Sequence, residues 1–132
     1  MEILNQRVDS SSYTKRLDAL DCVETIGAES KVVHSIPVPQ NVAMSIEVRF
    51  FVFDTSFTLG AIGTTRGMLL RSLGMPVVVG IDVINTLTNI TAPFPTLTFV
   101  PNVPNREIDV TITGKAGRTL HWHMELTVSR SV

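Results

Sequence analysis

Hydrophobic and polar positions alternate along most of this chain, and a period of two predicts β-strands rather than helices. The clearest case is residues 44–54, where one face is apolar throughout and the other begins polar and ends aromatic. Glycine and proline interrupt the pattern at intervals typical of sandwiches built from short strands. We therefore predict an all-β fold, a single antiparallel β-sandwich that is jelly-roll-like and has an N-terminal arm. The segments expected to be strands are 31–36, 44–54, 68–73, 76–81, 96–100, 107–113 and 119–128.

Composition supports the β assignment and limits the size of the fold. Val, Ile and Thr account for 17, 10 and 15 of the 132 residues, and β-branched side chains pack better on a pleated sheet than on a helix. A chain of this length can bury one substantial core without metals or disulfides. Cys22 is the single cysteine, so we expect a small buried apolar residue rather than half of an intramolecular disulfide.

Charge and hydropathy exclude several classes of protein. The 11 basic and 12 acidic residues give a net charge of −1, and neither sign forms the cationic stripe that a nucleic-acid-binding surface needs. The longest uncharged apolar stretch, residues 74–81, is far shorter than the ~20 residues of a membrane-spanning helix. Residues 1–7 lack the cationic start and apolar stretch of a signal peptide. We expect a protein that contacts neither nucleic acid nor membrane directly and is not secreted.

Residues 1–30 are richer in acidic side chains than the rest of the chain and allow two interpretations. One is a short helix with the apolar residues between 13 and 20 on one face. The other, which the alternation over residues 20–26 favours slightly, is an extended arm followed by a strand. We predict an anchoring arm at 1–30 and a β-sandwich domain at 31–132.

The last two predicted strands, 107–113 and 119–128, are expected to pair as an antiparallel hairpin. Their apolar positions share a face only if Ile112 lies opposite Leu120. That register leaves residues 115–117 as a three-residue loop with glycine third, where the backbone turns left-handed. The residues assigned to this structural hairpin are Gly114, Gly117 and Trp122.

His121 and His123 lie on the outward face of the last predicted strand, with Glu125 beyond them. A His-x-His pair on a strand can supply two ligands to zinc. The alternative is a solvated or interface face, which we favour because no other His or Cys occurs at a spacing typical of a metal site. We predict no metal and no cofactor.

Catalytic motifs are missing from the sequence. No Gly-x-Ser-x-Gly turn places a nucleophile, and no Cys and His occur in a recognisable catalytic context. The glycine-rich stretch 60–67 lacks the Lys-Ser/Thr end of a P-loop, so turns and bulges are the better interpretation. We expect that the protein is not an enzyme.

Residues 108–128 combine a strand, a Thr-Gly-x-Ala turn and a second strand with a tryptophan beyond the turn. This segment resembles the ending of many tailed-bacteriophage virion proteins. The likeness extends back through residues 80–86 and 36–39, so it covers about residues 20–132.

Proteins of this kind are structural parts of the virion, often small β domains that form trimers and dock through an N-terminal segment. The resemblance implies a non-enzymatic structural protein that self-associates, as a trimer, and decorates or stabilises the capsid or tail. Its partners would be its own copies and the major capsid or tail proteins, in a virion assembled in the bacterial cytoplasm. The alternative is a receptor- or carbohydrate-binding domain at the tip of a tail or head fibre.

One departure from the family pattern, at residues 50–53, predicts an interface. The family usually has small or basic residues in this long strand, whereas three of the four residues here are phenylalanine. We predict that these aromatic groups contact another subunit; the alternative is that they fill a second core layer of the same chain. The residues assigned to the interface are Phe51, Phe53, Phe57, Ile3, Leu4 and Tyr13.

Overall fold

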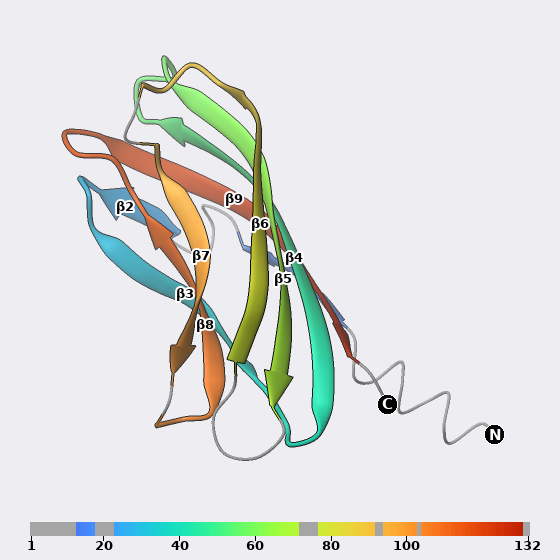
Figure 1. The fold of residues 1–132 in the computed structure, drawn as a ribbon. Coiled ribbons are helices and arrows are strands. Elements are labelled where there is room, and N and C mark those ends of the chain that lie inside the picture. Colours follow the sequence, from blue (N-terminus) through green and yellow to red (C-terminus); the bar gives the residue numbers. More distant parts are fainter. Residues whose placement is uncertain (1–12, 18–22, 72–76, 92–93, 103, 131–132) are drawn as a thin grey trace.

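The computed structural model describes residues 13–17, 23–71, 77–91, 94–102 and 104–130 (Figure 1). These residues form strands joined by turns and loops, and they contain no helix that could span a membrane. The all-β prediction is confirmed. The strands are β1 (Tyr13–Leu17), β2 (Glu24–Ile26), β3 (Ser30–Pro37), β4 (Val42–Asp54), β5 (Gly60–Arg71), β6 (Val77–Thr88), β7 (Thr96–Asn102), β8 (Glu107–Thr113) and β9 (Thr119–Arg130).

The strands assemble into two antiparallel sheets. The large sheet has the order β1-β9-β4-β5-β6, with β2 also paired to β9, and the small sheet has the order β3-β8-β7. The small sheet lies against one face of the large sheet (Figure 1). Buried side chains from both, such as Trp122 in β9 and Ile108 in β8, belong to one hydrophobic cluster. The opposite face of the large sheet points outward. That the two sheets form a jelly-roll-like sandwich stays a prediction.

β4 shows how the sequence pattern becomes structure. From Met44 onward its even-numbered residues are buried and its odd-numbered residues are exposed or half-buried, as expected for a strand with one face on a core. β3, β4 and β7 lie where strands were predicted. The side chains that β4 contributes to the core are Met44, Ile46, Val48, Phe50 and Val52.

The prediction of short strands at 68–73 and 76–81 is wrong, because β5 and β6 are 12 residues each. The glycines of residues 60–67, which the sequence pattern suggested lie at turns between strands, belong to β5 instead. The register with β6 shifts between Ile62 and Gly63, so a bulge does occur there. A Cβ on Gly67 would lie 2.8 Å from the ring of Phe99 in β7. Glycine at that position therefore permits close approach of the two sheets.

The predicted C-terminal hairpin is also wrong. β8 pairs with β3 and β7 in the small sheet, whereas β9 pairs with β1, β2 and β4 in the large sheet. The apolar residues of both strands, including Ile112 and Leu120, are buried as expected. Strand alternation determines which face of a strand is buried but not which strand pairs with it. Two strands in different sheets therefore satisfy the same pattern. Trp122 is therefore a core residue of the large sheet, not of a hairpin.

The loop between β8 and β9 crosses from one sheet to the other. Gly117 has φ of 75°, as predicted for its position, and Arg118 N donates to Lys115 O over 3.1 Å. The loop is joined to the turn after β2, since Gly114 N donates to Glu29 O at 3.0 Å and Gly27 N donates to Arg118 O at 2.8 Å. Gly114 therefore lies at a contact between two turns.

Residues 1–30 contribute β1 and β2 to the large sheet, and the helix interpretation is wrong for residues 13–17. Val23 is buried, and its carbonyl accepts from Trp122 N at 3.1 Å. Thr25 is fully buried, and its Oγ1 accepts from the indole Nε1 of Trp122 at 3.0 Å. Of the strand expected at 20–26, residues 20–22 lie outside the described residues, and β2 covers Glu24–Ile26. Cys22 lies outside the described residues.

Candidate interaction surface

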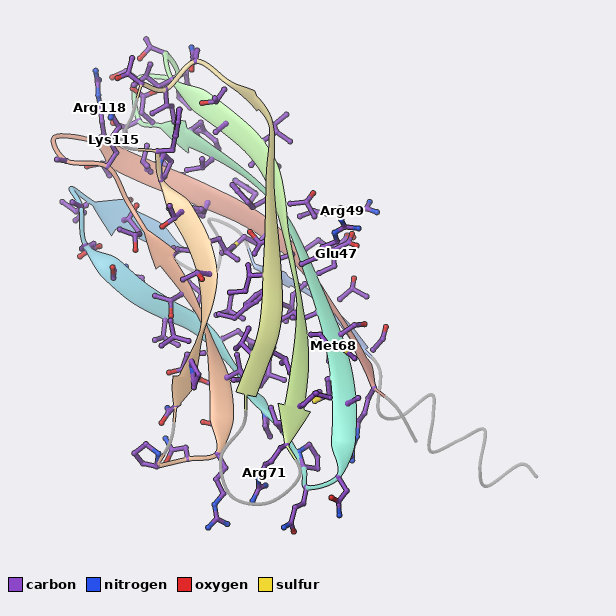
Figure 2. The ribbon with its side chains drawn as sticks, in the orientation of Figure 1. Glu47, Arg49, Met68, Arg71, Lys115 and Arg118 are labelled. Carbon is purple, nitrogen blue, oxygen red and sulfur yellow. The ribbon has the colours of Figure 1, made fainter. Side chains whose placement is uncertain are left out.

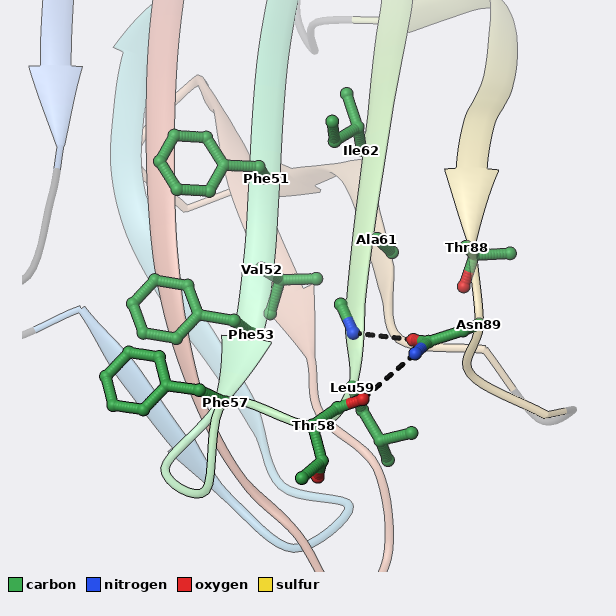
Figure 3. Close-up of a pocket in the computed structure, with 11 residues that line it drawn as sticks. Phe51, Val52, Phe53, Phe57, Thr58, Leu59, Ala61, Ile62, Thr88 and Asn89 are labelled. Carbon is green, nitrogen blue, oxygen red and sulfur yellow. Dashed lines mark hydrogen bonds between the residues drawn. The ribbon is translucent and has the colours of Figure 1, made fainter.

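Three phenylalanines lie together at one end of the outward face of the large sheet (Figure 3). Phe51 and Phe53 are alternate residues of β4, and Phe57 follows in the turn after that strand. Phe51 is 47% exposed and Phe57 is 80% exposed. Of the predicted interface residues, these three are brought into one place.

Two histidines of β9 complete this aromatic cluster, which we define as Phe51, Phe53, Phe57, His121 and His123. Because β4 and β9 are neighbours, Phe51 lies opposite His123 and Phe53 lies opposite His121. The rings of Phe51 and His123 are parallel within 2°, with centroids 4.6 Å apart. Phe53 stacks on Phe57 at 5.4 Å. Stacking of this kind adds to the burial of apolar area, so the cluster is a preformed surface.

A groove of about 520 Å³ runs beside the phenylalanines across β4, β5 and the end of β6. Gly60 lies opposite Phe53 in the register and contributes no side chain, while Ile62, 48% exposed, lies opposite Phe51. None of the residues that line the groove is charged. They are Phe51, Val52, Phe53, Phe57, Thr58, Leu59, Gly60, Ala61, Ile62, Thr88 and Asn89.

The polar side chains of the groove already have partners inside the protein. The Asn89 amide accepts from Gly60 N at 2.8 Å and donates to Thr58 O at 2.9 Å (Figure 3). The Thr58 hydroxyl donates to Asp54, and the Thr88 hydroxyl accepts from Ile90 N. Most of the surface that the groove presents outward is therefore apolar.

The turn that carries Phe57 is held by the buried carboxylate of Asp54. This carboxylate accepts from Thr58 N at 2.8 Å, from Thr58 Oγ1 at 2.9 Å and from Leu59 N at 3.0 Å. Arg118 Nη1 lies 3.6 Å away. The hydrogen bond from the Leu59 backbone, those from Thr58 and the charge of Arg118 lower the pKa of Asp54 below its usual range, although burial opposes this.

Replacing Asp54 with Asn should lower the melting temperature most at neutral pH. The lowered pKa means that the native protein favours the ionised carboxylate, so this stabilisation is complete above the ordinary value of 3.8 and is lost as pH falls through the native pKa. Melting curves from neutral to strongly acidic pH should therefore show the gap between wild type and Asp54→Asn closing in acid. A gap that is constant with pH would contradict this role of the carboxylate.

The aromatic cluster ends at a charged strip on the same face. Glu47 and Arg49 project outward from β4 (Figure 2) and form an ion pair of 3.0 Å. Arg49 also lies opposite Glu125 of β9, and a polar groove of about 440 Å³ crosses this region. Beyond the strip, Met68 and Leu70 are exposed. The aromatic cluster is therefore a bounded patch, not part of a uniformly apolar face.

The other predicted interface residues are not joined to the cluster. Ile3 and Leu4 lie outside the described residues. Tyr13 pairs with Val128, seven residues along β9 from His121, which is about 24 Å at 3.4 Å per residue. Sequence reasoning missed Ile62 and Asn89, and no signal in the sequence places them beside the phenylalanines.

The two histidines do not form a metal site with neighbours in the described part of the chain. His121 Nδ1 lies 3.6 Å from Glu24 Oε2, and the His123 ring is stacked on Phe51. Among the described residues, no group of three or more His, Cys, Asp or Glu side chains is placed to hold a metal ion. In this structure the rings of His121 and His123 extend the aromatic surface.

No protein-family profile and no curated protein matches the chain. Among solved structures it is similar to tailspike protein gp49 from Acinetobacter baumannii bacteriophage Fri1, a capsular polysaccharide depolymerase, with 8% identity and a TM-score of 0.46. It is also similar to the tailspike protein of Acinetobacter baumannii phage AM24, with 10% identity and a TM-score of 0.40. The matches cover 91% and 90% of this chain but only 19% and 25% of the tailspike chains. Likenesses this distant assign neither a fold family nor a function.

Proposed function

We propose that this chain is a non-enzymatic structural protein of a tailed-bacteriophage virion. It self-associates as a trimer through the aromatic cluster and decorates or stabilises the capsid or tail. The virion context is supported by the resemblance of residues 108–128 to phage virion proteins. The self-association is supported by one observation, the exposed phenylalanines beside an uncharged groove.

An apolar protein surface suits this groove better than a glycan does. Large contiguous apolar patches on a protein surface mark sites that meet a partner. A carbohydrate would need several hydrogen bonds from the groove, and Thr58, Thr88 and Asn89 are already engaged within the chain. The phenylalanine rings also stack on one another and on His123, which leaves less ring face for a sugar.

The double substitution Phe51→Ser and Phe53→Ser tests the self-association. Both side chains lie on the outward face, so the β4 core residues keep their contacts and the fold should be retained. We expect sedimentation analysis to show the wild-type chain as an oligomer and the variant as a monomer, with unchanged far-ultraviolet circular dichroism.

Val32→Ser with Val100→Ser is the matched control. These side chains, 52% and 43% exposed, lie on the small sheet, away from the cluster. The control should associate like wild type. A wild-type chain that is monomeric at every concentration would refute the self-association, and so would a Phe51→Ser/Phe53→Ser variant that associates normally.

A further inference from the structure

β6 is an open edge of the large sheet. Among the described residues it pairs only with β5, so the backbone N–H and C=O groups along its other side have no strand to pair with there. Its register with β5 shifts at two points, and the extra residues, Val79 and Thr86, bound a regular edge over residues 80–85. Such edges are where an extended segment of another chain can join a sheet.

The core side of this edge is partly uncovered. Ile81 lies opposite Gly67 of β5, on the side of the sheet where Phe99 of β7 packs. Leu69, two residues along β5 on the same side, is fully buried, but Ile81 is 41% exposed. A strand added beside β6 would cover this apolar side chain and pair the backbone groups of the edge at once.

β1 is an open edge at the other end of the strand order, and its five residues suit the length of the edge at 80–85. Every pairing between β1 and β6, through β9, β4 and β5, is antiparallel, so β1 and β6 run in the same direction. A second copy placed by rotation about an axis along the strands therefore presents its β1 parallel to β6, with the same side of the sheet outward.

The charges of the two edges are complementary. β1 carries Lys15 and Arg16 and no acidic residue, whereas Asp82 is the one charged residue of β6. Arg16 pairs with Glu125 in the register, and Asp82 pairs with Arg66. Both partners line the polar groove on the outward face, so positions 16 and 82 belong to that face. Pairing β1 with β1, or β6 with β6 at position 82, brings like charges together, whereas pairing β1 with β6 brings opposite charges together.

We propose that β6 of one copy pairs in parallel with β1 of the next copy, with Asp82 opposite Arg16, and that the repeated contact closes a ring such as a trimer. The inference rests on the proposed self-association and adds a backbone contact to it. Each copy uses two different edges, which is the arrangement that closes rings. With the outward faces turned toward the axis, the aromatic clusters of the copies approach one another, so the two contacts are compatible.

Ile81→Lys tests the edge. At this half-exposed position the lysine can reach solvent in a single chain, so the melting temperature in dilute solution should change little. A strand added beside β6 would bury its charge next to Lys15, and association should weaken by at least about thirtyfold in sedimentation analysis. Val100→Lys is the matched control, because Val100 is 43% exposed on β7, an edge strand of the small sheet. It should associate like wild type.

Charge reversal identifies the strand that pairs with β6. Arg16→Glu and Asp82→Arg should each weaken association by about threefold per contact, and the double variant should recover. The double variant restores opposite charges between copies but not within each chain, where position 16 stays beside Glu125 and position 82 beside Arg66. A role of these charges within the chain alone would give no recovery.

Weak association of Ile81→Lys, with Val100→Lys unaffected and the double reversal recovered, supports the proposal. Association of Ile81→Lys at wild-type strength overturns the edge contact but leaves the contact through the aromatic cluster standing. An effect of Asp82→Arg without one of Arg16→Glu overturns β1 as the partner. If Ile81→Lys lowers the melting temperature of the single chain, the charge-reversal variants decide. A monomeric wild type overturns both contacts.

Discussion

A chain that lacks residues 1–30 should be destabilised severely or fail to fold. The deletion removes β2, and with it the buried Val23 and the hydroxyl of Thr25 that accepts from Trp122 Nε1. Loss of one buried aliphatic side chain and one partner of a buried donor costs about 4 kcal/mol together. That is a large fraction of the 5–15 kcal/mol typical of a domain. Urea unfolding, followed by the fluorescence of Trp122, measures the change.

A chain that begins at residue 12 is the matched control, because it retains every contact described for β1 and β2. Thr25→Val is a second, smaller test, since it keeps the shape of residue 25 and removes only the acceptor for the indole. If the chain without residues 1–30 unfolds at the wild-type urea concentration, β2 is dispensable and the domain begins after it, as the sequence predicted. The predicted boundary at residue 30 is thus open to a direct measurement.

Gly114→Ala should be the most damaging single glycine substitution in the loop between β8 and β9. A Cβ at this position would overlap the carbonyl oxygen of Gly27 and lie 2.6 Å from Thr25 Oγ1. These atoms belong to a backbone turn and to a fully buried side chain, so neither can move easily. We expect a loss of about 3 kcal/mol in the free energy of unfolding, measured by urea denaturation.

Gly117→Ala, three residues later, is the comparison. No atom lies within 4 Å of a Cβ built on Gly117, so its cost is only that of positive φ, about 1 kcal/mol. Equal losses for the two variants would show that the contact between the two turns is not as tight as described.

The sequence predicted the strands of the core better than it predicted their partners. Alternation in β4, β8 and β9 identified the buried residues correctly, because burial of one face depends on local pattern. It could not show that β8 and β9 lie in different sheets, since Ile112 and Leu120 face the core in either arrangement. Glycines in β5 gave the same difficulty, because glycine both ends strands and permits close packing within them.

The candidate surface was likewise predicted in part. Phe51 and Phe53 were identified because they are apolar on a face that begins polar. His121 and His123 were assigned to an outward face, but their contact with the phenylalanines depends on the pairing of β4 with β9. Asn89 comes from a strand end far along the chain, so only the fold brings it to the groove.

The position of β9 has a consequence for the order of folding. β9 lies between β1 and β4, and β2 also pairs with it. β4, β5 and β6 can pair through contacts between neighbouring segments, whereas β1 and β2 have no partner in the large sheet until residues 119–130 are present. Closing such long loops slows folding. On the ribosome, the large sheet can be completed only after residues 119–130 have been synthesised.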